Sequence, residues 1–296
     1  MLFRESSLMA SPKQLSFFRV SLCLYLVVRF ITYIPMFIDQ YNFNKGLQVN
    51  LPIAEFLFLP LVSLEFAIVI FFLMISGLLL SAFSNKRFIF LIPTALLFVY
   101  FNLWRYSFAQ MPYTTYSPHD FNAVVIVLLF IAFNRNAYLY SLRELFTKSD
   151  LPHARDHSVF VIKLFLSLVF LQAVYTKMSN VGVSWMDGQH LQQFILWRYL
   201  ISANEFGYLL AQNQTLCMLG SIAVIAFQST AWILILRNHH KIFVIVSLMF
   251  FLGVRATLNI DFWTTQFSLY LIFLNVDWFT SKSKTAFKGK LKWATN

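Results

Sequence analysis

The sequence has few charged residues, since Asp, Glu, Lys and Arg make up only 12% of its 296 positions. A soluble domain has about a quarter of its residues charged, which covers its surface with groups that water solvates. In this chain 59% of the residues are hydrophobic, and 35 residues are phenylalanine. We therefore exclude a soluble globular class and predict that lipid surrounds much of the surface.

Cysteines and catalytic motifs are also scarce. The only two cysteines, Cys23 and Cys217, fall in apolar segments, which excludes a disulfide framework and a cysteine metal site. The chain has no Gly-rich phosphate loop, no G-x-S-x-G elbow and no H-E-x-x-H motif. Without a repeat or a Pro/Gly-rich linker, it is predicted to form one transmembrane domain over residues 1–280, followed by a basic cytoplasmic tail over 281–296.

Long apolar runs are what the sequence does contain. A membrane-spanning helix needs about 20 apolar residues. Eight runs approach this length: 16–38, 60–83, 88–105, 121–137, 158–176, 215–236, 241–257 and 262–280. The runs are continuous rather than alternating, which favours helices over a β-barrel. We expect an all-α, polytopic transmembrane helix bundle with about eight spans.

The basic residues predict the orientation of these spans. With the N-terminus in the cytoplasm, 17 of the 23 Lys and Arg residues fall on the cytoplasmic side and six on the other. This bias predicts a multi-pass protein of the cell (inner or cytoplasmic) membrane with both termini cytoplasmic. It also explains the net charge of +11 without a nucleic-acid partner. The first span is longer than a signal-peptide core and lacks a cleavage site, so we expect it to stay as an anchor.

Lys177 ends the fifth predicted span, on the side where lysines are scarce. It has two interpretations, and position alone favours the first by about two to one. A lysine at this depth can extend its ammonium to the lipid headgroups. Alternatively, it lies in a pocket between helices, where burial disfavours the ammonium and leaves a neutral amine able to act as a base. By contrast, Lys163 lies near the cytoplasmic end of the same span, from where we expect that it can reach the headgroups.

Other polar residues gather on the same predicted face as Lys177. His119 opens the fourth span and is either a polar helix-start residue or a group that assists Lys177 in proton transfer. Trp185, Asp187 and Gly188 form a turn. Tryptophan is common at the membrane interface and Asp-Gly is common in turns, so structure alone is a sufficient explanation of these residues. The segment that follows, LQQFILWRYL, is amphipathic and short, and either lies in the interface or folds back into the membrane.

Four stretches of the chain resemble the HTTM family, the membrane domain related to vitamin K-dependent gamma-carboxylase. The stretches are SFFRVSLCLYLVVRF, YNFNKGL, SPHDFNAVVIVLLFIAFNRNAYLYSL and LQAVYTKMSNVGVSWMDGQHL. The last contains the most specific motif, Lys…Trp-x-Asp-Gly. Small bacterial SdpB-like members, which help to mature a secreted toxin peptide, are similar to this chain in size.

The resemblance implies a site and a cofactor. In the carboxylases a lysine deprotonates reduced vitamin K, which then reacts with oxygen to give a strong base. By resemblance, Lys177 and His119 would be catalytic, while Tyr175, Trp185, Asp187 and Gly188 would bind substrate. The cofactor would be reduced vitamin K or a menaquinol-type quinol, and the partner a secreted peptide on the extracytoplasmic face.

Three departures from the family keep a non-catalytic alternative open. A glutamate usual in the sixth span is replaced near Gln228, and the histidine of the seventh span is absent, with Arg255 or Asn259 in its place. The large extracytoplasmic domain of the carboxylases is also missing. The chain is therefore expected to be either a quinol-using, carboxylase-like enzyme or maturation factor, or a membrane scaffold, immunity or accessory subunit that retains the fold.

Overall fold

The computed structural model describes residues 11–43, 63–109, 122–147, 157–260 and 267–274. This part of the chain is helical and contains no β-strand, which confirms the all-α prediction. The helices are α2 (Pro12–Phe43), α4 (Leu64–Phe83), α5 (Arg87–Ala109), α6 (Asn122–Phe133), α7 (Leu142–Thr147), α8 (Ser158–Val181), α9 (Gln189–Ser202), α10 (Glu205–Ala211), α11 (Gln214–Leu236) and α12 (His240–Leu258), with 3₁₀ helices η2 (Arg135–Tyr138), η3 (Gly182–Asp187) and η4 (Phe267–Phe273).

Five of these helices are long and apolar enough to cross a membrane: α2, α4, α8, α11 and α12. Shorter apolar helices, Ile89–Phe101 within α5 and Ala123–Phe133 within α6, occupy the third and fourth predicted spans. The described part of the eighth predicted span is the short helix η4, and the rest of that run lies outside the described residues, as does the basic tail. The fold is compatible with a multi-pass integral membrane protein, and the count of eight spans stays a prediction.

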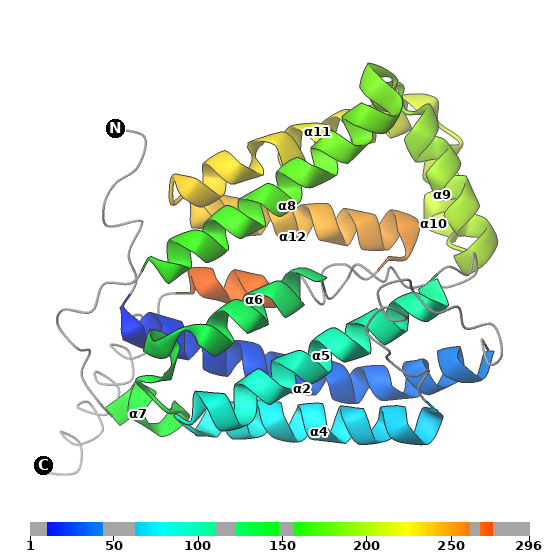
Figure 1. Ribbon diagram of the computed structural model, residues 1–296. Coiled ribbons are helices and arrows are strands. Elements are labelled where there is room, and N and C mark those ends of the chain that lie inside the picture. Colours follow the sequence, from blue (N-terminus) through cyan, green and yellow to red (C-terminus); the bar gives the residue numbers. More distant parts are fainter. Residues whose placement is uncertain (1–10, 44–62, 110–121, 148–156, 261–266, 275–296) are drawn as a thin grey trace, which may run out of the picture.

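The long helices form two layers, which Figure 1 shows one above the other. One layer holds α2, α4, α5 and α6, and the other holds α8, α11 and α12. Successive long helices run in opposite directions, so their termini gather at two ends of the bundle. We call one the Lys177 end (177–181, 214–217 and 255–258) and the other the Lys163 end (158–163 and 233–240).

Helix η4 lies between the two layers. It contacts α2 and α6 on one side. On the other, the Tyr270 ring packs against Phe243 and Phe251 of α12, with centroids 5.0 and 6.4 Å apart. An aromatic contact therefore joins the two layers of the molecule.

Arg19 joins the ends of three segments in the first layer. Its side chain is 0% exposed, and its two terminal nitrogens donate to the carbonyl oxygens of Ser84 (3.2 Å) and Tyr140 (2.9 Å). The guanidinium also lies 4.7 Å from the centroid of the Tyr138 ring. Ser84 caps the C-terminus of α4, where carbonyl groups lack partners within the helix. Arg19, which lies in the quoted stretch SFFRVSLCLYLVVRF, is thus a structural cation in this fold.

Candidate functional site at the end of helix α8

Helix α8 extends further than the apolar run predicts. The run was expected to end at residue 176, but the helix continues through Lys177 to Val181. It stops at Gly182, which has φ +73°, a conformation that residues other than glycine rarely adopt. Lys177 therefore lies on a helix, one turn before its end, rather than in a loop.

The Lys177 side chain turns back toward the bundle and is half-buried. Its Nζ donates to the carbonyl oxygen of Ala173 (3.2 Å) and to Oε1 of Gln228 (3.0 Å). It also lies 5.5 Å from the centroid of the Trp185 ring. Within the described part of the chain all three partners are neutral, and Lys177 has no carboxylate partner.

Gln228 is the residue of this site that sequence reasoning did not select. It lies on α11, which packs antiparallel to α8, and is 7% exposed. The sequence marked this position only as one where a family glutamate is replaced. A polar residue inside an apolar span normally faces the bundle interior, so the position itself was a signal. Its partner could not be identified because 51 positions separate it from Lys177.

The turn after α8 brings Trp185 to Lys177 but gives its other residues structural roles. An oxygen of Asp187 accepts a hydrogen bond from the backbone N–H of Gln189 (2.8 Å), at the start of α9. Gly188, with φ +86°, packs so closely on α11 that a Cβ atom would lie 2.4 Å from the backbone nitrogen of Met218. Glycine is therefore required there for the turn to lie against α11.

One predicted site residue, Tyr175, is not brought to Lys177. Tyr175 points away, with 68% of its side chain exposed, because residues two apart lie on different faces of a helix. His119 lies outside the described residues, so its convergence with Lys177 stays a prediction. The described site therefore consists of Lys177, Gln228 and Trp185, supported by Gly188.

Lys163 corrects one expectation from the sequence. It was expected to reach the headgroups, but it is only 6% exposed. Its Nζ donates to Oδ1 of Asn238 (3.1 Å) and lies 6.0 Å from the Phe273 ring. Asn238 follows α11 in the left-handed conformation, with φ +66°. The side chain turns inward because this turn, distant in sequence, places an acceptor inside the bundle.

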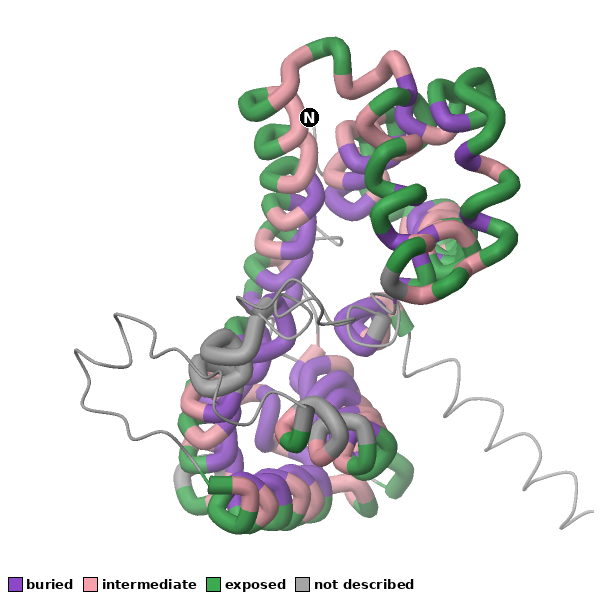
Figure 2. The backbone as a smooth tube through the Cα atoms, turned by 90° about the vertical axis from the view of Figure 1, so that its right-hand side faces the viewer, coloured by how far each residue is buried: buried purple, intermediate pink, exposed green. Residues whose placement is uncertain are grey.

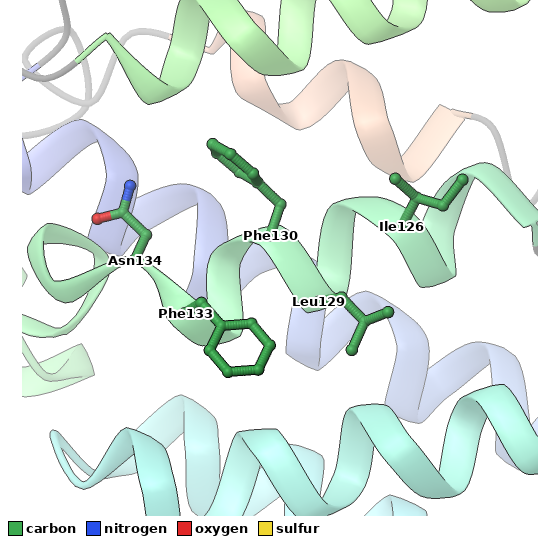
Figure 3. Close-up of a pocket in the computed structure, with 5 residues that line it drawn as sticks. All are labelled: Ile126, Leu129, Phe130, Phe133 and Asn134. Carbon is green, nitrogen blue, oxygen red and sulfur yellow. The ribbon is translucent and has the colours of Figure 1, made fainter.

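An open apolar recess of about 490 Å³ lies on α6. Figure 3 shows Phe130 on one side of the helix and Leu129 and Phe133 on another. Asn134 is the one polar residue among the five that line the recess. No group of three His, Cys, Asp or Glu side chains among the described residues could hold a metal ion. Both cysteines are buried free thiols.

Comparison with known proteins adds no relative: no family model, no curated protein and no solved structure matches the chain. The HTTM resemblance accordingly stays a prediction that rests on the residues quoted above.

Proposed function

We propose that this membrane protein binds a quinol or a small secreted peptide at the Lys177 end and uses Lys177 as a proton acceptor. The single observation that supports this proposal is that Nζ, half-buried, has only neutral partners: Ala173, Gln228 and Trp185. An ammonium without a carboxylate in a low-dielectric site either attracts an anion or gives up its proton.

The residues at this site suit the hydroxyl of a reduced quinone. A neutral Lys177 Nζ would accept the proton of that hydroxyl. Oε1 of Gln228 holds the nitrogen in place while staying uncharged, and the Trp185 indole offers an aromatic face. A bound quinol of the vitamin K type would supply an ionisable hydroxyl and two reducing electrons. His119 is proposed to assist the transfer, as the sequence suggests.

A non-catalytic scaffold is the second candidate, and one observation favours it. Lys163 and Asn238 form the same lysine–carboxamide pair at the opposite end of α8 and α11. Two such pairs would hold α8 and α11 together at both ends without either lysine having a catalytic role. In that case Lys177 contributes stability alone, and the fold would serve as an accessory, immunity or partner subunit.

The full-length protein in lipid nanodiscs distinguishes the two. The measurement is the affinity for a short-chain naphthoquinol, followed by tryptophan fluorescence quenching, together with the rate of oxygen-dependent quinol oxidation. We expect the wild type to exceed the lipid background. Lys177→Met and Lys177→Arg should both lose the acceleration, because an arginine keeps its proton. Lys241→Met, at an exposed position, is the matched control and should retain it.

The outcomes have separate meanings. Full activity in Lys177→Arg would disprove the role as a base. Wild-type protein that neither binds the quinol nor accelerates its oxidation would overturn the quinol proposal and leave the scaffold. Gln228→Leu adds a third measurement, because it removes the acceptor that holds Nζ of Lys177 in place. If Lys177 is a base, quinol oxidation should slow in this variant, whereas a purely structural contact would change stability alone.

A further inference from the structure

The two short helices between α8 and α11 present a mostly apolar outer face, on which Gln189, Gln193 and Glu205 are the exposed polar residues. Leu200 of α9 is 82% exposed, and its outward neighbours on α9 and α10 are also large and apolar: Phe194, Leu196, Trp197, Phe206, Tyr208 and Leu209. The one charged residue of α9, Arg198, is only 3% exposed and faces inward. A helix at a water surface has the opposite pattern, with its charges outside.

The inner face of this hairpin satisfies the C-terminus of α12. Nε and Nη2 of Arg198 donate to the carbonyl oxygens of Leu258 (3.0 Å) and Asn259 (3.3 Å). Nδ2 of Asn204 donates to the carbonyl oxygen of Ala256 (2.7 Å). An arginine guanidinium stays charged in proteins. A permanent cation therefore faces the negative end of the α12 dipole.

These protein donors indicate what surrounds the end of α12. The last four carbonyl groups of a helix have no partner within it, and at a water surface the solvent supplies the missing hydrogen bonds. Inside lipid no water is present, so the protein itself must supply every donor. Arg198 and Asn204 supply donors for the carbonyl groups of Ala256, Leu258 and Asn259. Donors from the protein favour a helix end that lies below the membrane surface.

Close packing fixes the hairpin in this position. A Cβ atom on Gly207 of α10 would lie 2.2 Å from the carbonyl oxygen of Thr257, so α10 lies directly on the last turn of α12. Nε2 of Gln192 on α9 donates to the carbonyl oxygen of Ala211 on α10 (2.6 Å), which joins the two helices. Figure 1 shows α9 and α10 across the ends of the long helices, and Figure 2 shows how much of this region is exposed.

We propose that α9 and α10 form a membrane-embedded hairpin that enters and leaves the bilayer at the Lys177 end, with lipid acyl chains against its outer face. Both flanking helices, α8 and α11, are long and apolar enough to cross the membrane, so the hairpin begins and ends where these helices reach the membrane surface. The apolar outer face, the inward Arg198 and the protein-capped end of α12 all favour lipid as the occupant. The inference does not depend on the chemistry of Lys177.

Cysteine accessibility in vesicles of phosphatidylcholine and phosphatidylglycerol tests the proposal. In a Cys23→Ser, Cys217→Ser background, single cysteines are placed at Leu200 and at Leu209, one on each helix. Gln212→Cys, at the exposed end of α10, is the matched control. We expect a charged, membrane-impermeant thiol reagent to modify both hairpin cysteines at least about tenfold more slowly than the control, because a charge does not enter acyl chains.

A fluorescent label gives a second, independent readout. A nitrobenzoxadiazole group at Leu200 or Leu209 should emit at shorter wavelength than at Gln212 and should be quenched by spin-labelled lipid. Equal reaction rates at all three positions, with no quenching by lipid, would overturn the proposal and leave the apolar face as a protein-docking surface in water. If Leu200→Cys disturbs folding, Leu209→Cys decides the result alone.

Discussion

Arg19 and Lys177 are both cations turned into the helix bundle, but their surroundings differ. Arg19 is fully buried, and backbone carbonyl groups that cannot move hold two of its nitrogens. Lys177 is half-buried, and its principal partner is the side-chain amide of Gln228, which can rotate. A cation fixed by backbone groups at helix ends can only stabilise the fold. One held by a movable amide beside an exposed surface can also exchange a partner or a proton.

Lys163 shows that burial alone does not identify the functional cation. It is more buried than Lys177 and has a similar amide partner, Asn238. What separates the two lysines is access, because Lys177 keeps an exposed portion and the Trp185 ring beside it. This comparison assigns candidate chemistry to Lys177 and structural roles to Arg19 and Lys163, and three sets of variants can break or sharpen it.

The largest effect is expected from Arg19→Met. The change removes the Arg19 hydrogen bonds to the carbonyl groups of Ser84 and Tyr140, and each hydrogen bond to a charged group contributes about 1.5–3 kcal/mol. We therefore expect the free energy of unfolding to fall by about 4 kcal/mol. Arg19→Lys should recover roughly half of this loss, because one ammonium cannot reproduce a planar two-nitrogen contact. The measurement is thermal unfolding of the purified protein in detergent.

A small effect of Arg19→Met would contradict the assignment. If the variant unfolded within about 1 kcal/mol of the wild type, Arg19 would not be a structural cation. The contrast with Lys177 would then no longer separate fold from function.

The sequence predicted the helical elements of this comparison better than their contacts. Apolar runs gave most of the long helices because lipid requires about 20 apolar residues in sequence. They placed the end of α8 five residues early, since polarity marks where the apolar run ends and a helix stops only where Gly182 permits it. The expected exposure of Lys163 was wrong because its acceptor, Asn238, lies 75 positions away.

The candidate site was predictable only where its residues are close in sequence. The motif containing Lys177 and Trp185 is local, and the structure brings these two residues together. Asp187 and Gly188 belong to the motif as well, but local turn and packing roles explain them. Gln228 reaches the site only through the packing of α11 on α8, which no local pattern encodes.

Gly188 tests whether the contact between η3 and α11 holds Trp185 over Lys177. In Gly188→Ala the new Cβ atom would meet backbone atoms of Met218 and Cys217, and its φ of +86° strains an alanine. We expect a loss of about 2–3 kcal/mol in stability, with a change in Trp185 fluorescence. Gly253→Ala is the matched control, because its Cβ atom meets open space on a helix and should be neutral or slightly stabilising. Equal behaviour of the two variants would show that η3 is not held by this contact.

The smallest effects come from a pair of double-mutant cycles on the two lysine–amide contacts. One cycle combines Lys177→Met with Gln228→Leu, and the other combines Lys163→Met with Asn238→Gly, which keeps the left-handed turn. Each hydrogen bond should give a coupling of about 1 kcal/mol in unfolding free energy. We expect only the first cycle to change quinol affinity, because Lys163 lacks the access that Lys177 has. Coupling in stability without any change in affinity at Lys177 would make the two contacts equivalent clamps, and the difference between a structural and a chemical cation would then rest on Arg19 alone.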